Sequence, residues 1–480
     1  MFLKQDKTEL PLYIIAASPA QKRVLSGTGR KHFLRLKGYM QSLVRNAYHA
    51  LRSCAFLRSP TKEFKAIDVL MITYIYESYT VGEDPFFGDL ITRLKKSKSN
   101  LSYLIMPYVH GRFGRALAMC KNHKNVELLF SGLGFSEIVK SFYITLSRFS
   151  SDKLGCFRFV IDGIDLGDLL IESLHNDITN GTYFYNILLH ESFKKKIRKR
   201  LIKEIIYPYE NKSLEKMILL AVRSDSPQTA CVGYQHSSVT QRHTTLLFEK
   251  NESISTPLPD KIITLGEVTR NFLQENGNYP HGVLQRGSAL RQSFPLSIKP
   301  FPKSSDTHIR ILLPLSSSKM ELLESIVFCK KVRDLYPNIK FGVRPHPEFP
   351  LALLPTEDIA WLDENGVDLS GTSLKDNIFW ADICVYVSST VAVEAMMYGL
   401  PVINLRLNDV IDPDPVLNNP FWHWQVCTPD ALVELVKQWE IMSDSDIEKG
   451  MKTAREYAKE YFFQPTDKNV QQFLMGWESE

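Results

Sequence analysis

Short apolar runs alternate with helical patterns along most of this chain. The strand-like runs in its first part are residues 10–17, 67–76, 101–106, 126–130, 230–234 and 261–265. Apolar residues at helical spacing separate most of these runs, and a long basic helix is predicted from about residue 31 to residue 55. Strands that alternate with helices favour a parallel sheet covered on both faces.

A break in this pattern divides the chain. Residues 295–306 contain three prolines and three serines, which is typical of a linker. After it come strand-like runs at 309–313, 339–343, 381–387 and 401–405, a helix from Met320, and a polar helical tail over 444–463. The sequence therefore predicts an α/β protein of two tandem Rossmann-like domains, residues 1–300 and 301–480. Ligands of such sheets bind beyond the carboxyl ends of the strands, here in an interdomain cleft.

Two segments of the second domain predict an anion site. The first, Arg344-Pro-His-Pro, ends a buried strand; the second, Ser388-Ser-Thr, joins a strand to a helix. Free backbone N–H groups and the helix dipole at such a turn attract the phosphate of an activated donor. The candidate residues are Arg344, His346, Pro347, Ser388, Ser389 and Thr390. The alternative is a pair of ordinary strand–helix turns.

Composition narrows the class of protein. The chain has 480 residues, of which 44% are hydrophobic and 23% charged, as in ordinary globular proteins. Its seven cysteines are scattered without a Cys-x-x-Cys pair, which argues against a disulfide framework or a zinc site. No apolar run reaches the roughly 18 residues that span a bilayer, and the first residues lack a secretory signal. We therefore expect a cytoplasmic protein.

The net charge of +5 is unevenly distributed. Residues 1–66 hold thirteen Lys/Arg against three Asp/Glu, and residues 193–206 hold seven cations among apolar residues at helical spacing. The second cluster predicts a basic amphipathic helix that binds an anionic membrane surface, although a solvated helix with its apolar stripe in the core explains it equally well. No nucleic-acid motif is present, so nucleic acid is not an expected partner.

At these motifs the chain resembles the GT-B glycosyltransferases, and most of all the bacterial surface-polysaccharide branch. That branch includes Kdo transferases, sialyltransferases that use CMP-sialic acid, and glycerophosphate transferases. His346-Pro347 and Ser388-Ser389 resemble its two short donor motifs. The segment from Glu394 to Gly399 is similar to the nucleotide-sugar helix of GT-B enzymes, which implies that Glu394 holds the ribose. The resemblance also implies an acceptor-binding first domain and a nucleotide-sugar-binding second domain.

Three segments of the first domain strengthen this resemblance. Residues 159–168 look like the Asp-Gly-x-x-x-Gly-Asp segment of surface carbohydrate transferases, and residues 233–238 resemble a Gln-His-Gly motif with serine in place of glycine. Residues 287–291 resemble a Gly-Ser-x-x-Arg turn. Sugar transfer needs a carboxylate near the anomeric carbon. The candidates are Asp162 and Asp165 with His236 beside them, and more weakly Asp225 and Glu267. Each of these is also explicable as a capping, turn or structural residue.

The resemblance implies a metal-independent transferase without a resident cofactor, because no metal-ligand cluster is obvious. The donor it implies is a CMP-activated acidic sugar, Kdo or another nonulosonate. The acceptor is a surface polysaccharide or lipid-linked glycan at the inner face of the bacterial inner membrane. A CDP-glycerol phosphotransferase, an enzyme like UDP-N-acetylglucosamine 2-epimerase, and an inactive binding module remain as alternatives.

Overall fold

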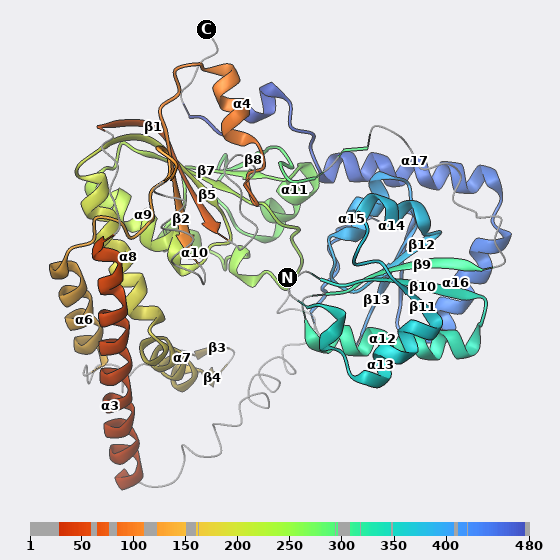
Figure 1. The fold of residues 1–480 in the computed structure, drawn as a ribbon, viewed down its shortest axis with the longest axis horizontal. Helices are drawn as coiled ribbons and strands as arrows, with labels where there is room; N and C mark the ends of the chain where they lie inside the picture. Colours follow the sequence, from red (N-terminus) through yellow and green to blue (C-terminus); the bar gives the residue numbers. More distant parts are fainter. Residues whose placement is uncertain are drawn as a thin grey trace.

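The computed structural model describes residues 28–58, 65–75, 84–109, 122–149, 160–161, 163–292, 294–295, 308–316, 318–346, 349–407, 411–419 and 421–475. Two α/β domains lie side by side, and each is built on a parallel sheet (Figure 1). The predicted fold class, two tandem Rossmann-like domains, is therefore confirmed. The predicted strand at 10–17 and most of the predicted linker fall outside these residues.

The first sheet has six parallel strands. Their spatial order is β2 (Tyr103–Val109), β1 (Ala66–Ile75), β5 (Leu201–Pro208), β6 (Ala230–Tyr234), β7 (Lys261–Thr264) and β8 (Leu284–Arg286). The chain order reverses direction across the sheet at the β1–β5 pair, and parallel sheets bind ligands beyond such a point. The helices α9 (Ser213–Asp225), α10 (Glu252–Ser255) and α11 (Glu267–Asn276) follow β5, β6 and β7 along the chain.

A layer of long helices extends from the first sheet, below it in Figure 1. It contains α3 (Thr28–Ser53), α6 (Phe135–Phe149), α7 (Gly167–Asn180) and α8 (Thr182–Ile197). Helix α3 packs against α6 and α7, while α8 packs against α6, α7 and α9. The long basic helix predicted from the sequence is thus present, and a 3-10 turn, η2 (Cys54–Arg58), follows it. None of the helices in the described ranges is long and apolar enough to cross a membrane.

The second sheet also has six parallel strands. Their spatial order is β11 (Gly366–Asp368), β10 (Ile339–Arg344), β9 (Ile309–Pro314), β12 (Ile383–Tyr386), β13 (Val402–Leu405) and β14 (His423–Val426). The switch in strand order lies between β9 and β12, next to the predicted serine turn. The helices of this domain are α12 (Lys319–Leu335), α13 (Thr356–Asn365), α14 (Leu374–Trp380), α15 (Val391–Met397) and α16 (Pro429–Ile441).

The end of the chain returns to the first domain. Helix α17 (Asp444–Tyr461) crosses from the second domain, and α18 (Asp467–Gln471) packs against α4 (Leu90–Ser97) of the first. Backbone hydrogen bonds join Phe463 to Leu265 and Ala289, and the Met475 N–H donates to the buried Glu204 carboxylate at 3.1 Å. The polar tail predicted over 444–463 is thus a helix that links the two domains.

One predicted strand is wrong. Residues 126–130 form only a single bridge, from Val126 to Ile105 near the start of β2, before the chain turns. The Glu127 N–H donates to the Ile105 carbonyl at 3.0 Å and the Leu129 N–H to the Pro107 carbonyl at 3.3 Å. Pro107 has no N–H to donate in return, so the pairing does not develop into a full strand. Glu127 is fully buried, and its carboxylate is paired with Lys196 and Arg200.

The predicted basic amphipathic helix over 193–206 is also wrong. Helix α8 ends at Ile197, three residues form a turn, and strand β5 begins at Leu201. The isoleucine-rich sequence after Arg200 suits a strand, because branched side chains pack well on a pleated surface.

The cations of that cluster hold the first domain together. Lys194 and Arg198 pair with Asp225, Lys195 pairs with Glu137, and Lys196 and Arg200 pair with Glu127. The exposed fraction of the Lys196 side chain is 6%, so this lysine faces no solvent or membrane. Its predicted role on a membrane face is therefore corrected: the cluster is structural.

Candidate active site

The turn after β12 places its three hydroxyls at the edge where the domains meet. The Ser388 hydroxyl donates to Glu321 Oε2 at 2.7 Å, and the Ser316 hydroxyl oxygen lies 3.1 Å from it. The Ser389 hydroxyl accepts from the Val391 N–H at 3.4 Å.

Two contacts cross between the domains at this turn. The Thr390 hydroxyl lies 2.7 Å from the hydroxyl of Ser238, which follows β6 of the first domain. The Arg242 guanidinium, from the same loop of the first domain, forms an ion pair with Glu321 at the start of α12. The chain Ser388–Glu321–Arg242 therefore joins the carboxyl ends of both sheets through one carboxylate.

Glu321 and Arg242 were not predicted from the sequence. A signal existed: Ser318-x-x-Glu321 directly after a strand is a capping-box pattern, which marks a helix start beside a binding edge. The Ser318 hydroxyl does accept from the Glu321 N–H at 3.5 Å. However, the glutamate side chain turns to Ser388 and Arg242 rather than back to the cap, and only the folded interface reveals this.

Glu394 lies within electrostatic range of an arginine from each domain, Arg291 and Arg344. Burial raises the pKa of this carboxyl to about 7, while Arg291 and Arg344 act in the opposite direction. Arg291 comes from the turn after β8, and its guanidinium lies 5.8 Å from the centre of the Phe86 ring. Arg344 ends β10, where it donates to Asn377 Oδ1 at 2.6 Å. Arg344 and Glu394, which were predicted separately as donor-binding residues, are thus close enough to interact electrostatically.

His236 is buried at the carboxyl end of β6. Burial lowers the pKa of its imidazole to about 4, Glu210 opposes this and Arg291 adds to it, so the ring is neutral at pH 7. Its Nε2 lies 3.7 Å from Glu210 Oε1, and no partner of its Nδ1 lies within the described residues. The Phe86 ring packs edge-on at 4.7 Å. A neutral imidazole suits hydrogen bonding to a sugar carboxylate better than protonating a leaving group.

The remaining predicted carboxylates lie in different places. Asp165 is exposed on the hairpin of β3 (Val160–Ile161) and β4 (Ile164–Asp165), beside α7 in Figure 1, and its Oδ1 accepts from the Gly167 N–H at 2.9 Å. Asp162 falls outside the described residues. Asp225 ends α9, and Glu267 begins α11, where it pairs with Arg270. The carboxylate near His236 is instead Glu210, which was not predicted from the sequence although it lies two residues after the end of β5.

The histidine-proline segment is only partly described. His346 follows β10 and forms an isolated bridge with Phe349, whereas Pro347 falls outside the described residues. Among the residues that are described, no three His, Cys, Asp or Glu side chains gather as metal ligands.

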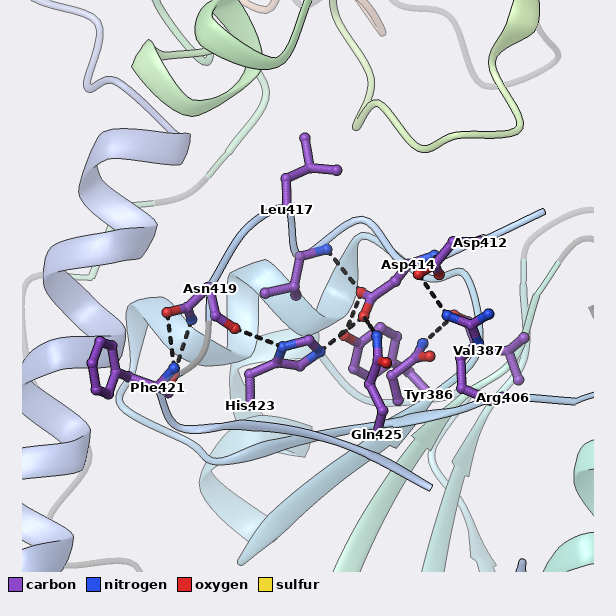
Figure 2. Close-up of polar contacts among 12 residues, drawn as sticks. Tyr386, Val387, Arg406, Asp412, Asp414, Leu417, Asn419, Phe421, His423 and Gln425 are labelled. Atoms are coloured by element: carbon purple, nitrogen blue, oxygen red, sulfur yellow. Dashed lines mark hydrogen bonds and ion pairs between the residues drawn. The ribbon is translucent and has the colours of Figure 1, made fainter. Parts of the chain in front are cut away.

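A buried polar network supports the strand that carries the serines (Figure 2). The Tyr386 hydroxyl, two residues before Ser388, donates to Asp414 Oδ1 at 2.6 Å. His423 Nε2 lies 2.8 Å from Asp414 Oδ2 and its Nδ1 lies 2.9 Å from the Asn419 carbonyl. Both ring nitrogens face acceptors, an arrangement that favours the doubly protonated imidazole. Burial acts against the charge, but Asp414 raises the pKa of His423. This network fixes the loop between β13 and β14 against β12.

Comparisons with known proteins give only remote likenesses. No protein-family model and no curated protein matches the chain. Among solved structures, MurG of Acinetobacter baumannii is 10% identical over 86% of this chain and 100% of its own, with a TM-score of 0.49. The calicheamicin glycosyltransferase CalG4 is 12% identical over 86% and 98%, with a TM-score of 0.48. UDP-GlcNAc 2-epimerase of Neisseria meningitidis is 12% identical over 85% and 99%, with a TM-score of 0.45. Likenesses this remote do not decide the activity.

Proposed function

We propose that this protein is a metal-independent GT-B glycosyltransferase that moves an acidic sugar, Kdo or another nonulosonate, from a CMP donor. The acceptor is a surface polysaccharide or a lipid-linked glycan, and the enzyme works at the inner face of the bacterial inner membrane. The observation that carries the proposal is the set of polar contacts from both domains at the ends of β6, β9 and β12, with arginines on either side. Such a site fits a donor that carries a phosphate and a carboxylate.

Each predicted residue has a role in this proposal. Ser388, Ser389 and Thr390 donate hydrogen bonds to the donor phosphate, and Arg344 with the His346-Pro347 segment offsets its charge. Glu394 holds the ribose hydroxyls. The neutral His236 orients the sugar carboxylate. Hydroxyls and guanidinium groups neutralise a phosphate without a metal ion, which supports a metal-independent reaction in this proposal.

The catalytic carboxylate has two sources in this proposal. Asp162 or Asp165 serves as base or nucleophile if the hairpin of β3 and β4 reaches the acceptor. Glu210 is the second candidate, because its Oε1 lies 3.7 Å from His236 Nε2 at the carboxyl end of β5. A carboxylate beside the neutral imidazole accepts the acceptor proton where the donor is oriented.

A nucleotide panel tests the donor. Thermal unfolding of the full chain is followed with CMP, CDP, UDP and GDP in parallel, and with Ser388→Ala and Ser389→Ala. A ligand at about 100 times its dissociation constant adds roughly 2.7 kcal/mol to the free energy of unfolding. We expect stabilisation by CMP and CDP but not by UDP or GDP, and a loss of about 1–2 kcal/mol of binding in at least one serine variant. Preferential stabilisation by UDP, or unchanged CMP affinity in both variants, contradicts the proposal.

A further inference from the structure

Helix α3 exposes an apolar stripe to water. The stripe consists of Met40, Val44, Tyr48 and Leu51, whose exposed fractions are 51%, 63%, 58% and 73%. Their spacing of four, four and three residues places them on one side of the helix. The opposite side is held by the domain: Asn46 is fully buried and its Nδ2 donates to the Ile178 carbonyl of α7 at 2.9 Å. The stripe therefore faces outward from a docked helix.

The neighbouring helix α6 repeats this arrangement. Its exposed apolar residues are Phe135, Val139 and Tyr143, with exposed fractions of 66%, 48% and 70%. They too are spaced by four residues, while Ile138 of the same helix is buried in the core. Helices α3 and α6 pack against each other in the layer below the first sheet in Figure 1. Neighbouring exposed apolar stripes of this kind are typical of an interaction surface.

Charge shows which partner fits the α3 stripe. The helix contains Arg30, Lys31, Arg35, Lys37, Arg45 and Arg52, and it contains no aspartate or glutamate. Arg45 and Arg52 are exposed, and each directly follows a residue of the stripe in the sequence. A helix with an apolar stripe flanked by cations is the type that lies in the headgroup region of an anionic bilayer, with aromatic residues at the interface.

We infer that the exposed stripes of α3 and α6 dock the protein on the surface of a bilayer that contains anionic phospholipids. A second copy of this chain is the weaker partner, because a two-fold interface would set the cations of α3 against the same cations of its copy. The surface differs from residues 193–206, where Lys196 and Arg200 are buried in ion pairs with Glu127.

This inference rests on the proposed function in one respect: the membrane surface would bring the enzyme to a lipid-linked acceptor. Binding to a vesicle needs neither donor nor acceptor. If the protein binds vesicles but is not stabilised by CMP or CDP, the proposed function is rejected and the membrane-binding surface is retained. If the protein binds CMP but does not bind vesicles, only the membrane-binding surface is rejected.

Flotation of the full-length protein with phosphatidylcholine vesicles, with or without phosphatidylglycerol, tests the surface. We expect flotation only with the anionic vesicles, reversed by salt. The double variant Val44→Glu/Tyr48→Glu should lower the bound fraction at least tenfold, and Tyr143→Glu on α6 should lower it as well. Ile441→Glu is the matched control, because that isoleucine is 85% exposed on another helix and should float like the wild type.

Charge-reversal variants complete the test. Arg45→Glu/Arg52→Glu should abolish flotation, whereas Lys449→Glu/Lys452→Glu on the exposed side of α17 should not. Circular dichroism of every variant checks that α3 still folds. Equal binding to neutral and anionic vesicles, or wild-type flotation of the folded α3 variants, would overturn the inference. So would a wild-type dimer that becomes monomeric in Val44→Glu/Tyr48→Glu.

Discussion

Ser388 was predicted to face a donor phosphate, and in the structure it donates to the Glu321 carboxylate instead. The two groups are chemically related, since both are anionic oxygens that accept hydrogen bonds from hydroxyls and guanidinium groups. Glu321 also holds Arg242, the cation that the first domain brings to this edge. A bound phosphate would therefore compete with Glu321 for both partners.

Replacing Glu321 by Gln should tighten binding of CMP. The variant keeps the size of the side chain, removes a negative charge from the anion site and frees Arg242. We expect a dissociation constant about five to ten times lower, which corresponds to roughly 1–1.4 kcal/mol. Isothermal titration calorimetry measures it. Glu324→Gln is the control, because it makes the same change three residues further along α12 and should leave the affinity unchanged; weaker binding in Glu321→Gln contradicts this account of the site.

The serine motif of the second domain directed attention to Ser388 and Thr390, which do lie at the interdomain edge because the turn closely follows β12. Arg344 and Glu394 share one environment, and Ser388 and Thr390 contact groups from other elements. Glu210 and Arg242 were not predicted, because their neighbours come from other loops and no sequence motif marks them. Position after a strand is the only local signal for Glu210.

At the scale of elements, residues 193–206 show the limit of periodicity. The apolar residues of this segment fit both helical and strand spacing, and the cations between them indicated an exposed face. The groups that determine the structure of this segment are distant in sequence. Glu127 forms ion pairs with Lys196 and Arg200, and Asp225 forms ion pairs with Lys194 and Arg198. Without knowledge of these partners, the end of α8 and the start of β5 could not be predicted.

Glu127→Gln tests the structural role of this cluster. The carboxylate is fully buried between Lys196 and Arg200, so its loss leaves two cations without a counter-charge, and we expect a loss of about 3 kcal/mol of stability. Urea unfolding at pH 7 measures it. Glu137→Gln, which breaks the more exposed pair with Lys195, should cost less than about 1 kcal/mol. Equal losses of stability in the two variants would show that burial does not determine how much each ion pair contributes to stability.

The stability that Glu127 contributes through Lys196 and Arg200 depends on pH. Burial raises the pKa of Glu127, but Lys196 and Arg200 outweigh it and bring the value to about 2. A depressed folded-state pKa stabilises the protein above the unfolded value of 4.5, and this stability is lost as the pH falls towards 2. In Glu127→Gln this part of the acid sensitivity should disappear.

At the scale of the whole molecule, the alternation of strands and helices was sufficient to predict two tandem parallel-sheet domains. The contacts that join them were not predictable, because they pair residues far apart in the chain. Examples are Ser238 with Thr390, Arg242 with Glu321, and the buried Glu204 with the Met475 N–H. These contacts bring the serine turn of one sheet to the carboxyl edge of the other.

The central claim concerns what the assembled site transfers. The full-length protein is incubated with acceptor membranes and with CMP-Kdo, CDP-glycerol or UDP-N-acetylglucosamine supplied singly, and the products are followed by ³¹P nuclear magnetic resonance. We predict CMP formation from CMP-Kdo with the sugar joined to the acceptor. Asp165→Asn or Glu210→Gln should abolish this transfer while CMP binding is retained. A new phosphodiester formed from CDP-glycerol, or conversion of UDP-N-acetylglucosamine alone, with CMP-Kdo left intact, would contradict the account.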